Sequence, residues 1–228
     1  MLLGAPRHKP SRFSETTSDR GCTDHYMAGE HLQRDARMRR IDRIERRVVS
    51  DVLRRLASGS TVADVPCGNG RMSQIVLEQD GLGLVALDLN PGMLASMSVR
   101  GNDRLLQRCA CANVLELPLA DQSVDMLINM RLLHHIEDRA TRLGMLRELA
   151  RVSRRWLITS FWTTHCWRYV RRRLLGKQIR GFPIAPRDFR ELCDEAGLDI
   201  LRLVPARRLY EEQVVAVCRT RAAKEPPA

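Results

Sequence analysis

One short stretch of the sequence has the residue types needed to bind an anionic ligand. The apolar run Thr61–Val65 leads into a turn that contains Gly68 and Gly70. Glycine has no side chain, so a ligand can approach the backbone of such a turn closely. The helix expected after the turn would offer free N–H groups and the positive end of its dipole. The turn therefore favours a ligand that carries a carboxylate or a phosphate.

Two later segments add groups suited to a nucleoside. Asp88 ends the next apolar run and lies 24 residues after Asp64. In nucleotide-binding α/β folds, an acid about 20 residues beyond the glycine turn accepts hydrogen bonds from ribose hydroxyls. Asn113 and Val114 follow a third apolar run, where an amide can bond to an adenine edge. A glycine turn alone is a common false positive, but the three segments in this order predict a nucleoside-binding site.

The apolar pattern predicts the elements that would position these groups. We expect helices at 29–56, 71–79, 93–99, 140–152 and 186–196, and strands at 61–65, 84–89, 105–112, 125–130, 156–161, 198–205 and 213–219. Alternation of strands and helices implies a parallel sheet with helices on both faces. The closing strand pair implies an antiparallel edge. The predicted fold class is therefore α/β, with a doubly wound, mostly parallel sheet.

The same segments resemble the motifs of the class I S-adenosylmethionine-dependent methyltransferases, in the small-molecule type. The run from Asp64 to Gly70 resembles motif I with Pro66 in place of its first glycine. Further similarity lies in 85–94, 113–125, 132–136 and 148–152, so that it covers about residues 60–161 and extends more loosely to 219. The resemblance implies a seven-stranded Rossmann-like fold and S-adenosylmethionine as the cofactor.

The resemblance also implies which residues hold the cofactor. Asp88 would bind the ribose, Asn113 and Val114 the adenine, and Asp64 would help to orient the amino-acid end. The full implied set is Asp64, Pro66, Gly68, Asn69, Gly70, Asp88, Leu89, Met93, Asn113, Val114 and Asn129. The sequence departs from the family pattern at Asn113, where an acid is common, and at 153–155, where a Lys-Pro-Gly-Gly-like turn is usual.

Two other readings of the motifs fit the sequence less well. A nicotinamide dinucleotide fold would need glycine at position 73, where Ser73 stands. Methyltransferases of the families that methylate DNA amino groups or glutamine carry an Asn/Asp-Pro-Pro-Tyr/Phe motif after the fourth strand. Here residues 129–132 read Asn-Met-Arg-Leu, which argues against an exocyclic base nitrogen as the target.

The segment after the fourth predicted strand supplies candidates for acceptor chemistry. His134 and His135 would act as general bases, because histidine titrates near neutrality. The alternative is that they pack beneath the cofactor, since many methyl transfers need only alignment of the reactants. Arg131 would face an anionic acceptor, or would be an ordinary surface arginine.

Residues 162–185 interrupt the alternation and read as an insertion. Aromatic residues mix there with a cationic run, and Trp162, Cys166, Val170 and Leu174 recur at four-residue spacing on one predicted helical face. Four interpretations remain open. The insertion could be a lid over the acceptor, a helix on an anionic membrane surface, a contact for RNA or DNA phosphates, or a plain solvated helix.

Composition sets wider limits. The net charge is +11 and the pI about 10.1, which suggests anionic partners. However, all basic residues except Lys9, Lys177 and Lys224 are arginine, so coding bias weakens that inference. The seven cysteines form no CxxC pair and no zinc-like spacing, so we expect reduced thiols and no metal. No apolar run approaches the roughly 20 residues of a membrane span.

The sequence thus predicts a disordered segment at 1–28, a methyltransferase domain at 29–220 with an Arg/Trp-rich cap at 162–185, and a flexible tail at 221–228. The predicted function is methyl transfer from S-adenosylmethionine to a small-molecule or lipid-like acceptor, anionic in character. The alternatives are an RNA-modifying methyltransferase and a non-catalytic cofactor-binding regulatory subunit. The predicted location is the cytoplasm, with peripheral contact to the inner face of a membrane left open, and nucleic acid is the less favoured partner.

Overall fold

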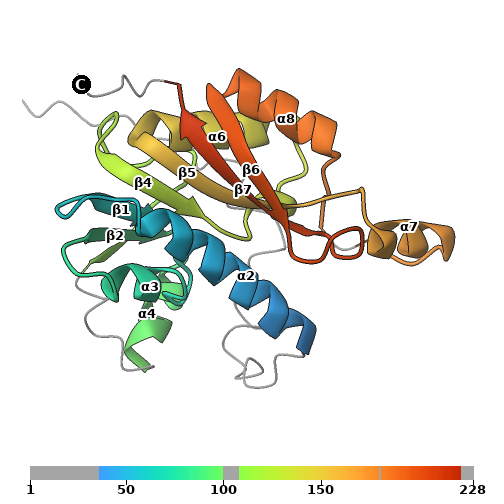
Figure 1. The fold of residues 1–228 in the computed structure, drawn as a ribbon, viewed down its shortest axis with the longest axis horizontal. Helices are drawn as coiled ribbons and strands as arrows, with labels where there is room; N and C mark the ends of the chain where they lie inside the picture. The colour runs from blue at the N-terminus through green and yellow to red at the C-terminus, as the bar shows by residue number, and fades with distance from the viewer. Residues whose placement is uncertain (1–35, 100–107, 180, 222–228) are drawn as a thin grey trace, which may run out of the picture. The chain divides into compact units, whose positions relative to one another are not determined.

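A computed structural model describes residues 36–99, 108–179 and 181–221 (Figure 1). The predicted disordered segment 1–28 and the tail beyond 221 lie outside the described residues. The sheet has seven strands in the order β3-β2-β1-β4-β5-β7-β6. The strands are β1 Thr61–Asp64, β2 Gly83–Asp88, β3 Cys109–Cys111, β4 Val124–Asn129, β5 Ser153–Trp162, β6 Leu198–Pro205 and β7 Gln213–Thr220.

The sheet is parallel except at one edge. β1 pairs in parallel with β2 and β4, whereas β7 is antiparallel to both β5 and β6. The predicted seven-stranded α/β fold with an antiparallel edge is therefore confirmed. Strand order reverses at β1, because β2 and β3 lie on one side of it and β4 on the other. In such sheets ligands bind beyond the carboxyl ends of the strands at this switch point.

Helices cover both faces of the sheet (Figure 1). α2 Ala36–Leu53, α3 Ser73–Leu77 and α4 Pro91–Val99 lie on one face, and α6 Arg139–Val152 and α8 Pro186–Glu195 on the other. The short 3-10 helix η3 Leu133–His135 follows β4, and α7 Trp167–Leu174 follows β5. Because β1 to β5 all pair in parallel, their carboxyl ends lie at the same edge of the sheet.

Side-chain periodicity explains how α2 packs. Ile41, Val48, Val49 and Val52 are buried, while arginines fill much of the opposite face. This spacing matches one face of a helix of 3.6 residues per turn. The apolar stripe joins a core cluster with alternate residues of the central strands, such as Val62. The predicted amphipathic helix is therefore confirmed within the described part of its range.

The opposite face of the sheet is covered by α6 and α8. Asp138 caps the start of α6, where its carboxylate accepts a hydrogen bond of 2.7 Å from the backbone N–H of Thr141. Leu146 and Leu149 of α6 are fully buried. The ring of Phe161 in β5 stacks on Phe189 of α8, with centroids 4.0 Å apart. These contacts hold β5 against the helices on this face of the sheet.

The insertion after β5 differs in one respect from its predicted form. Trp162 is the last residue of β5, where it pairs with Gln213 of β7, and α7 begins only at Trp167. The prediction that Trp162 shares a helical face with Val170 is therefore wrong. Strand pairing with β7 holds the backbone extended and overrides the four-residue spacing. Cys166 instead caps α7, and its sulfur accepts from the N–H of Tyr169.

Candidate functional site

The turn after β1 is built around the carboxylate that ends β2. Gly68 N–H donates to Oδ2 of Asp88 over 2.8 Å, and Asn90 N–H donates to Oδ1 over 2.9 Å. Gly68 and Gly70 have φ values of +55° and +79°, in the left-handed region that favours glycine. Gly70 N–H donates back to the carbonyl of Cys67. Sequence segments 20 residues apart are thereby joined into one cradle.

This cradle fits the adenosine part of S-adenosylmethionine. Two backbone N–H groups hold the carboxylate of Asp88 in place, and a carboxylate at this position accepts hydrogen bonds from a ribose diol in nucleotide-binding α/β folds. Leu89, the next residue, is 44% exposed and presents an apolar surface on which a base can lie. A Cβ placed on Gly68 would stand 3.4 Å from Cε of Met93. The predicted residues 68, 70, 88, 89 and 93 are thus brought together.

The predicted adenine contact lies after β3. Asn113 uses Oδ1 to accept the N–H of Leu115 over 3.0 Å, which fixes the side chain in a local turn. Its Nδ2 is the group that can donate to a ring nitrogen of adenine. Val114 beside it is buried. An acid is common at this position, whereas the amide of Asn113 offers a donor, and its contact with the cofactor stays a prediction.

Asp64 lies at the end of β1 and is buried. Its Oδ2 accepts a hydrogen bond of 2.6 Å from the hydroxyl of Ser73 in α3. Burial raises the pKa of Asp64 to about 7, although Ser73 and Arg71 act in the opposite direction. The carboxyl group ties β1 to α3, and its predicted role toward the amino-acid end of the cofactor stays a prediction.

The pKa of Asp64 predicts a pH dependence of stability. In the unfolded chain this group ionises near its usual value of 3.8, but in the folded protein it keeps its proton to about pH 7. Because the folded protein binds this proton more tightly than the unfolded chain does, the proton stabilises the fold. This stabilisation is fully present below about pH 4 and is lost as the pH rises through 7. A difference of three pKa units corresponds to about 4 kcal/mol. We expect Asp64→Asn to remove this slope.

The measurement is chemical denaturation of the cofactor-free protein between pH 4 and 8. Other groups titrate in both proteins, so the informative quantity is the wild-type value minus the Asp64→Asn value at each pH. That difference should fall with rising pH. Two stability curves that run parallel across the range would contradict the burial argument.

The remaining motif I residues lie in the turn after β1, and Asn129 is bonded to protein groups. Pro66 follows a cis peptide bond, and Asn69 lies between the two glycines, half-buried. Asn129, at the end of β4, is fully buried; its Nδ2 donates to the carbonyl of Val65 and its Oδ1 accepts from Thr159. The amide therefore joins β4 to β1 and β5. Its partners here are protein groups, and its predicted contact with the cofactor stays a prediction.

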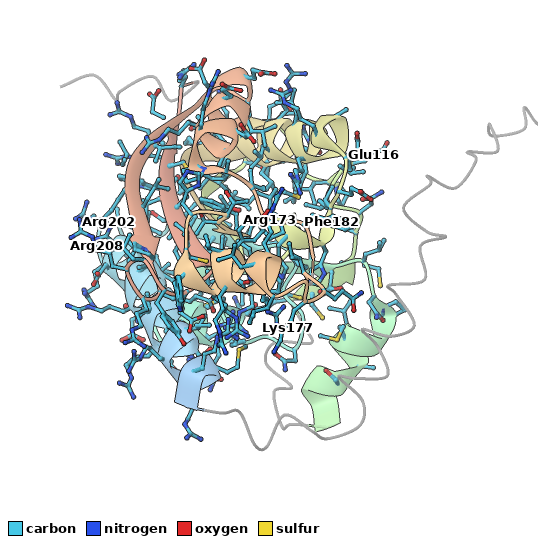
Figure 2. All side chains as sticks on the ribbon, turned by 90° about the vertical axis from the view of Figure 1, so that its right-hand side faces the viewer. Glu116, Arg173, Lys177, Phe182, Arg202 and Arg208 are labelled. Atoms are coloured by element: carbon cyan, nitrogen blue, oxygen red, sulfur yellow. The ribbon has the colours of Figure 1, made fainter. Side chains whose placement is uncertain are left out.

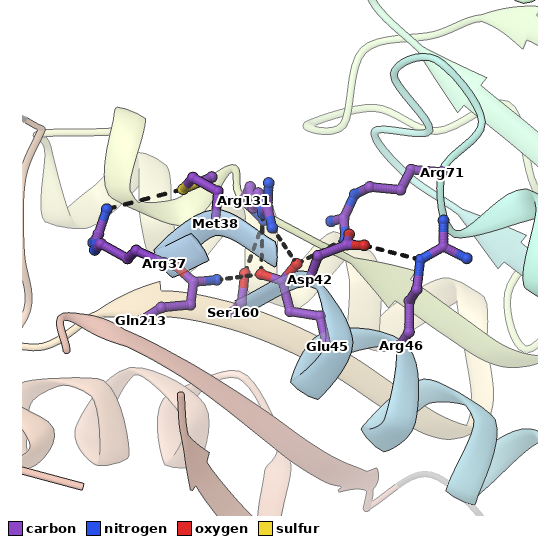
Figure 3. Close-up of polar contacts among 9 residues, drawn as sticks. All are labelled: Arg37, Met38, Asp42, Glu45, Arg46, Arg71, Arg131, Ser160 and Gln213. Atoms are coloured by element: carbon purple, nitrogen blue, oxygen red, sulfur yellow. Dashed lines mark hydrogen bonds and ion pairs between the residues drawn. The ribbon is translucent and has the colours of Figure 1, made fainter. Parts of the chain in front are cut away.

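A buried ion cluster that the sequence did not predict lies beside the cradle (Figure 3). Glu45 of α2 has no exposed surface. Its Oε2 lies 2.8 Å from Nη1 of Arg71 and 2.6 Å from Nη2 of Arg131, and its Oε1 accepts from Nε2 of Gln213 over 2.8 Å. Asp42 adds a second carboxylate at 2.6 Å from Arg71. The sequence does not predict this cluster, because an acid such as Glu45 among the arginines of α2 looks like an ordinary residue of a solvated helix face.

The cluster determines the surroundings of Arg131, the predicted acceptor contact. Nε and Nη2 of Arg131 both donate to the carboxylate of Glu45, whose negative charge compensates the positive charge of the guanidinium. The backbone of Arg131 has a φ of +60°, and its N–H donates to the hydroxyl of Ser160 in β5. The structure thus shows Arg131 holding the turn after β4 in place. A contact with an anionic acceptor stays a prediction.

Two histidines follow in η3, and they differ in environment. His134 is buried, and its ring stacks on Trp162 with centroids 3.9 Å apart. Burial, His135 and the charge of Arg131 lower the pKa of His134 well below 6.5, so the ring is neutral at pH 7. Its Nδ1 has no hydrogen-bond partner in the described part of the chain. His135 is exposed by comparison, and desolvation lowers its pKa as well.

Residues 181–184 form a strap across this turn. Phe182 N–H donates to the carbonyl of His134 over 2.8 Å, and Ile184 N–H donates to the carbonyl of Trp162 over 2.7 Å. Nη2 of Arg142 in α6 holds the carbonyl of Phe182. Gly181 is required here, because a Cβ at this residue would lie 2.7 Å from the carbonyl oxygen of His134. The end of the insertion is thereby fixed over the turn after β4 and the end of β5.

In 36–99, 108–179 and 181–221, no group of His, Cys, Asp and Glu side chains is arranged to hold a metal ion. Within these ranges no helix is long and apolar enough to cross a membrane.

Comparison with known proteins bears on the cradle directly. Residues 63–155 match the family model described as a methyltransferase domain. The tRNA (carboxymethyluridine(34)-5-O)-methyltransferase ALKBH8 of Mus musculus is 30% identical over 106 residues, which are 46% of this chain and 15% of that protein. The matched stretch spans between 15% and 40% of the curated relatives' own length.

Solved structures agree with the fold. Magnesium protoporphyrin IX methyltransferase from Synechocystis PCC 6803, with bound S-adenosylhomocysteine, gives a TM-score of 0.67 at 16% identity over 89% of this chain and 100% of that one. A SAM-dependent methyltransferase from Methanosarcina mazei gives 0.60 at 17% identity over 74% and 96%. The matched region therefore marks residues 63–155, which include the cradle around Asp88, as a methyltransferase domain, and the solved structures share its fold.

Proposed function

We propose that this protein transfers a methyl group to a small-molecule or lipid-like acceptor of anionic character. The observation that carries the proposal is the strap at 181–184, which is hydrogen-bonded to the turn after β4 and to the end of β5. A covered acceptor side suits a small molecule or a lipid head group. Support for anionic character comes from the same insertion, where Arg171 and Lys177 are exposed and have no carboxylate partner among the described residues.

The chain's own residues supply orientation. The bound cofactor brings an electrophilic methyl group on a positively charged sulfur. Asp88 and the glycine turn hold the adenosine end, and the Glu45 cluster holds Arg71 and Arg131 on either side of the switch point. A nucleophile placed in line with the methyl group then reacts without further assistance.

A general base is not needed in this scheme. A base with a strongly lowered pKa holds an abstracted proton poorly, and His134 has such a pKa because it is buried. Its stack on Trp162 suits a packing role beneath the acceptor. The catalytic roles predicted for His134 and His135 remain predictions.

A specific observation favours a second candidate, methylation of RNA. Curated relatives matched over 104 and 106 residues are named as tRNA methyltransferases. Such an enzyme would bind nucleic acid with a strong dependence on salt, because phosphate contacts release counterions.

The test is transfer of labelled methyl groups from S-adenosylmethionine to fractionated cell extract. Label in lipid or anionic small-molecule fractions, insensitive to ribonuclease, is the expected outcome, and an Asp88→Ala variant should give none. Label in ribonuclease-sensitive material would replace the proposal with RNA methylation. Cofactor binding with no labelled product in any fraction would favour a non-catalytic regulatory subunit.

A further inference from the structure

The surface of α7 combines exposed cationic and apolar side chains outside the cradle around Asp88. Figure 1 shows α7 beyond the ends of β6 and β7, apart from α6 and α8. None of its residues is buried, although it is strongly amphipathic. Its first turn is tied to the loop between β6 and β7, since Trp167 N–H donates to the carbonyl of Leu209 over 2.8 Å. The helix is therefore anchored at one end and open along its length.

One side of this helix is apolar and exposed. Trp167, Val170 and Leu174 follow each other at three- and four-residue spacing, so they share one face. Trp167 is 54% exposed and Leu174 is 76% exposed. Leu175, which follows Leu174, and Leu209, whose carbonyl accepts the N–H of Trp167, are exposed as well. Contiguous exposed apolar surface rimmed by polar residues marks an interaction site rather than ordinary surface.

Cationic side chains border this apolar face, since Arg171 lies four residues after Trp167. A cleft of about 190 Å³ lies there, and none of the described residues that line it is acidic. The lining includes Trp167, Arg168, Arg171, Arg172, Lys177 and Tyr210. Arg168 is paired with Glu212 at 3.4 Å, and Arg172 donates to the carbonyl of Gln178. The side chains of Arg171 and Lys177, by contrast, have neither an ion pair nor a hydrogen bond with any residue that the structure describes, and only their backbone groups are bonded within the end of the helix. Figure 2 views this end of the molecule, with Arg173 and Lys177 labelled.

We propose that α7 docks the protein on an anionic lipid surface. Trp167, Val170 and Leu174 enter the boundary between head groups and acyl chains, while Arg171 and Lys177 bind lipid phosphates. A helix with an apolar face that carries Trp and Leu and a polar face rich in arginine lies in the plane of such an interface. Juxtaposed basic residues add electrostatic attraction to anionic lipids.

The aliphatic side chains favour a lipid surface over RNA. Proteins that bind single-stranded nucleic acid offer aromatic rings for base stacking and cations for phosphates. Trp167 and Tyr210 satisfy that description, but Leu174, Leu175 and Leu209 do not, and they are among the most exposed apolar side chains on this surface. Their burial in an acyl layer gives them a partner that a polynucleotide lacks.

The test is binding of the full chain to vesicles of phosphatidylcholine with and without phosphatidylglycerol, measured by sedimentation without cofactor or acceptor. We expect binding only to the anionic vesicles, weakened by salt. The pair Arg171→Gln/Lys177→Gln should weaken it at least about tenfold, because each cation contributes noticeably near the surface. The pair Trp167→Ser/Leu174→Ser should weaken it to a similar extent. These four side chains are exposed, so the fold should be retained, as circular dichroism can verify.

Matched controls lie on other elements. Arg187→Gln/Arg190→Gln removes two exposed cations from α8, and Leu201→Ser removes an exposed apolar side chain from β6; both should bind vesicles as the wild type does. Addition of anionic vesicles should also shift the tryptophan emission of the wild type to the blue, and Trp167→Phe should lose that shift.

Equal binding by the α7 variants and their controls would overturn the proposal. It would also be overturned if a single-stranded RNA oligonucleotide bound in place of the vesicles and lost affinity on substitution of Arg171 and Lys177. The assay does not depend on methyl transfer, so its failure and the failure of the proposed enzymatic function are separate results.

Discussion

Replacement of Asp88 by alanine is expected to lower the affinity for S-adenosylmethionine at least about a hundredfold. A hydrogen bond to a charged group contributes about 1.5–3 kcal/mol, and a ribose diol can make two with this carboxylate. The substitution also removes the acceptor for the N–H groups of Gly68 and Asn90, so the turn after β1 loses its anchor. Calorimetric titration of the purified protein with S-adenosylmethionine measures the change directly.

The matched control for this variant is Asp80→Ala. Asp80 is an exposed acid just beyond α3, so its loss changes the net charge equally and leaves the cradle intact. The affinity of the Asp80→Ala variant for S-adenosylmethionine should equal that of the wild type. Thermal denaturation of both variants separates loss of the ribose contact from loss of the fold. Unchanged binding by a folded Asp88→Ala protein would remove this carboxylate from the cofactor site.

Replacement of Glu45 by alanine is expected to destabilise the protein by about 3–5 kcal/mol. The cost arises because removing one partner of a buried ion pair leaves the other charges buried without compensation. Arg71 and Arg131 would both lose their shared carboxylate, and Gln213 would lose its acceptor. Burial lowers the pKa of Arg71, but the carboxylates of Glu45 and Asp42 raise it further than burial lowers it. The two carboxylates therefore stabilise the charged guanidinium.

An exposed ion pair on the same helix provides the control. Asp51 lies 2.5 Å from Arg54 on the surface of α2, and such pairs contribute about 0–1 kcal/mol. Asp51→Ala should therefore shift the denaturant midpoint little. A Glu45→Gln variant, which keeps the size of the side chain without its charge, should fall between the two. If Glu45→Ala lowered the free energy of unfolding no more than Asp51→Ala does, the cluster would not stabilise the fold.

The Glu45 substitution should also weaken cofactor binding. Arg71 directly follows Gly70, and Arg131 holds the turn after β4, so the cluster links both loops of the switch point to α2. We expect a lower affinity even at temperatures where the variant is fully folded. That effect is measurable by the same titration as for Asp88→Ala.

The sequence by itself determined the order of elements, the class of sheet and the cofactor cradle. These depend on short-range features: apolar alternation marks strands, three- and four-residue spacing marks helices, and glycines mark a turn that needs a left-handed backbone. The predicted strand at 198–205 agrees with β6 at both ends, and Asp88 lies where its motif implied. Local patterns sufficed because each of these features is decided within a few residues.

Only the tertiary structure decided what surrounds Arg131 and His134, the residues predicted to serve the methyl acceptor. Glu45, Arg71, Arg131 and Gln213 come from four distant segments, and nothing near any of them in sequence shows that one carboxylate serves the other three. Trp162 had helical spacing, yet pairing with β7 kept it in a strand and placed its ring on His134. Partners separated by many residues meet only when the sheet assembles, so the charge state and contacts of these side chains depend on the packed fold.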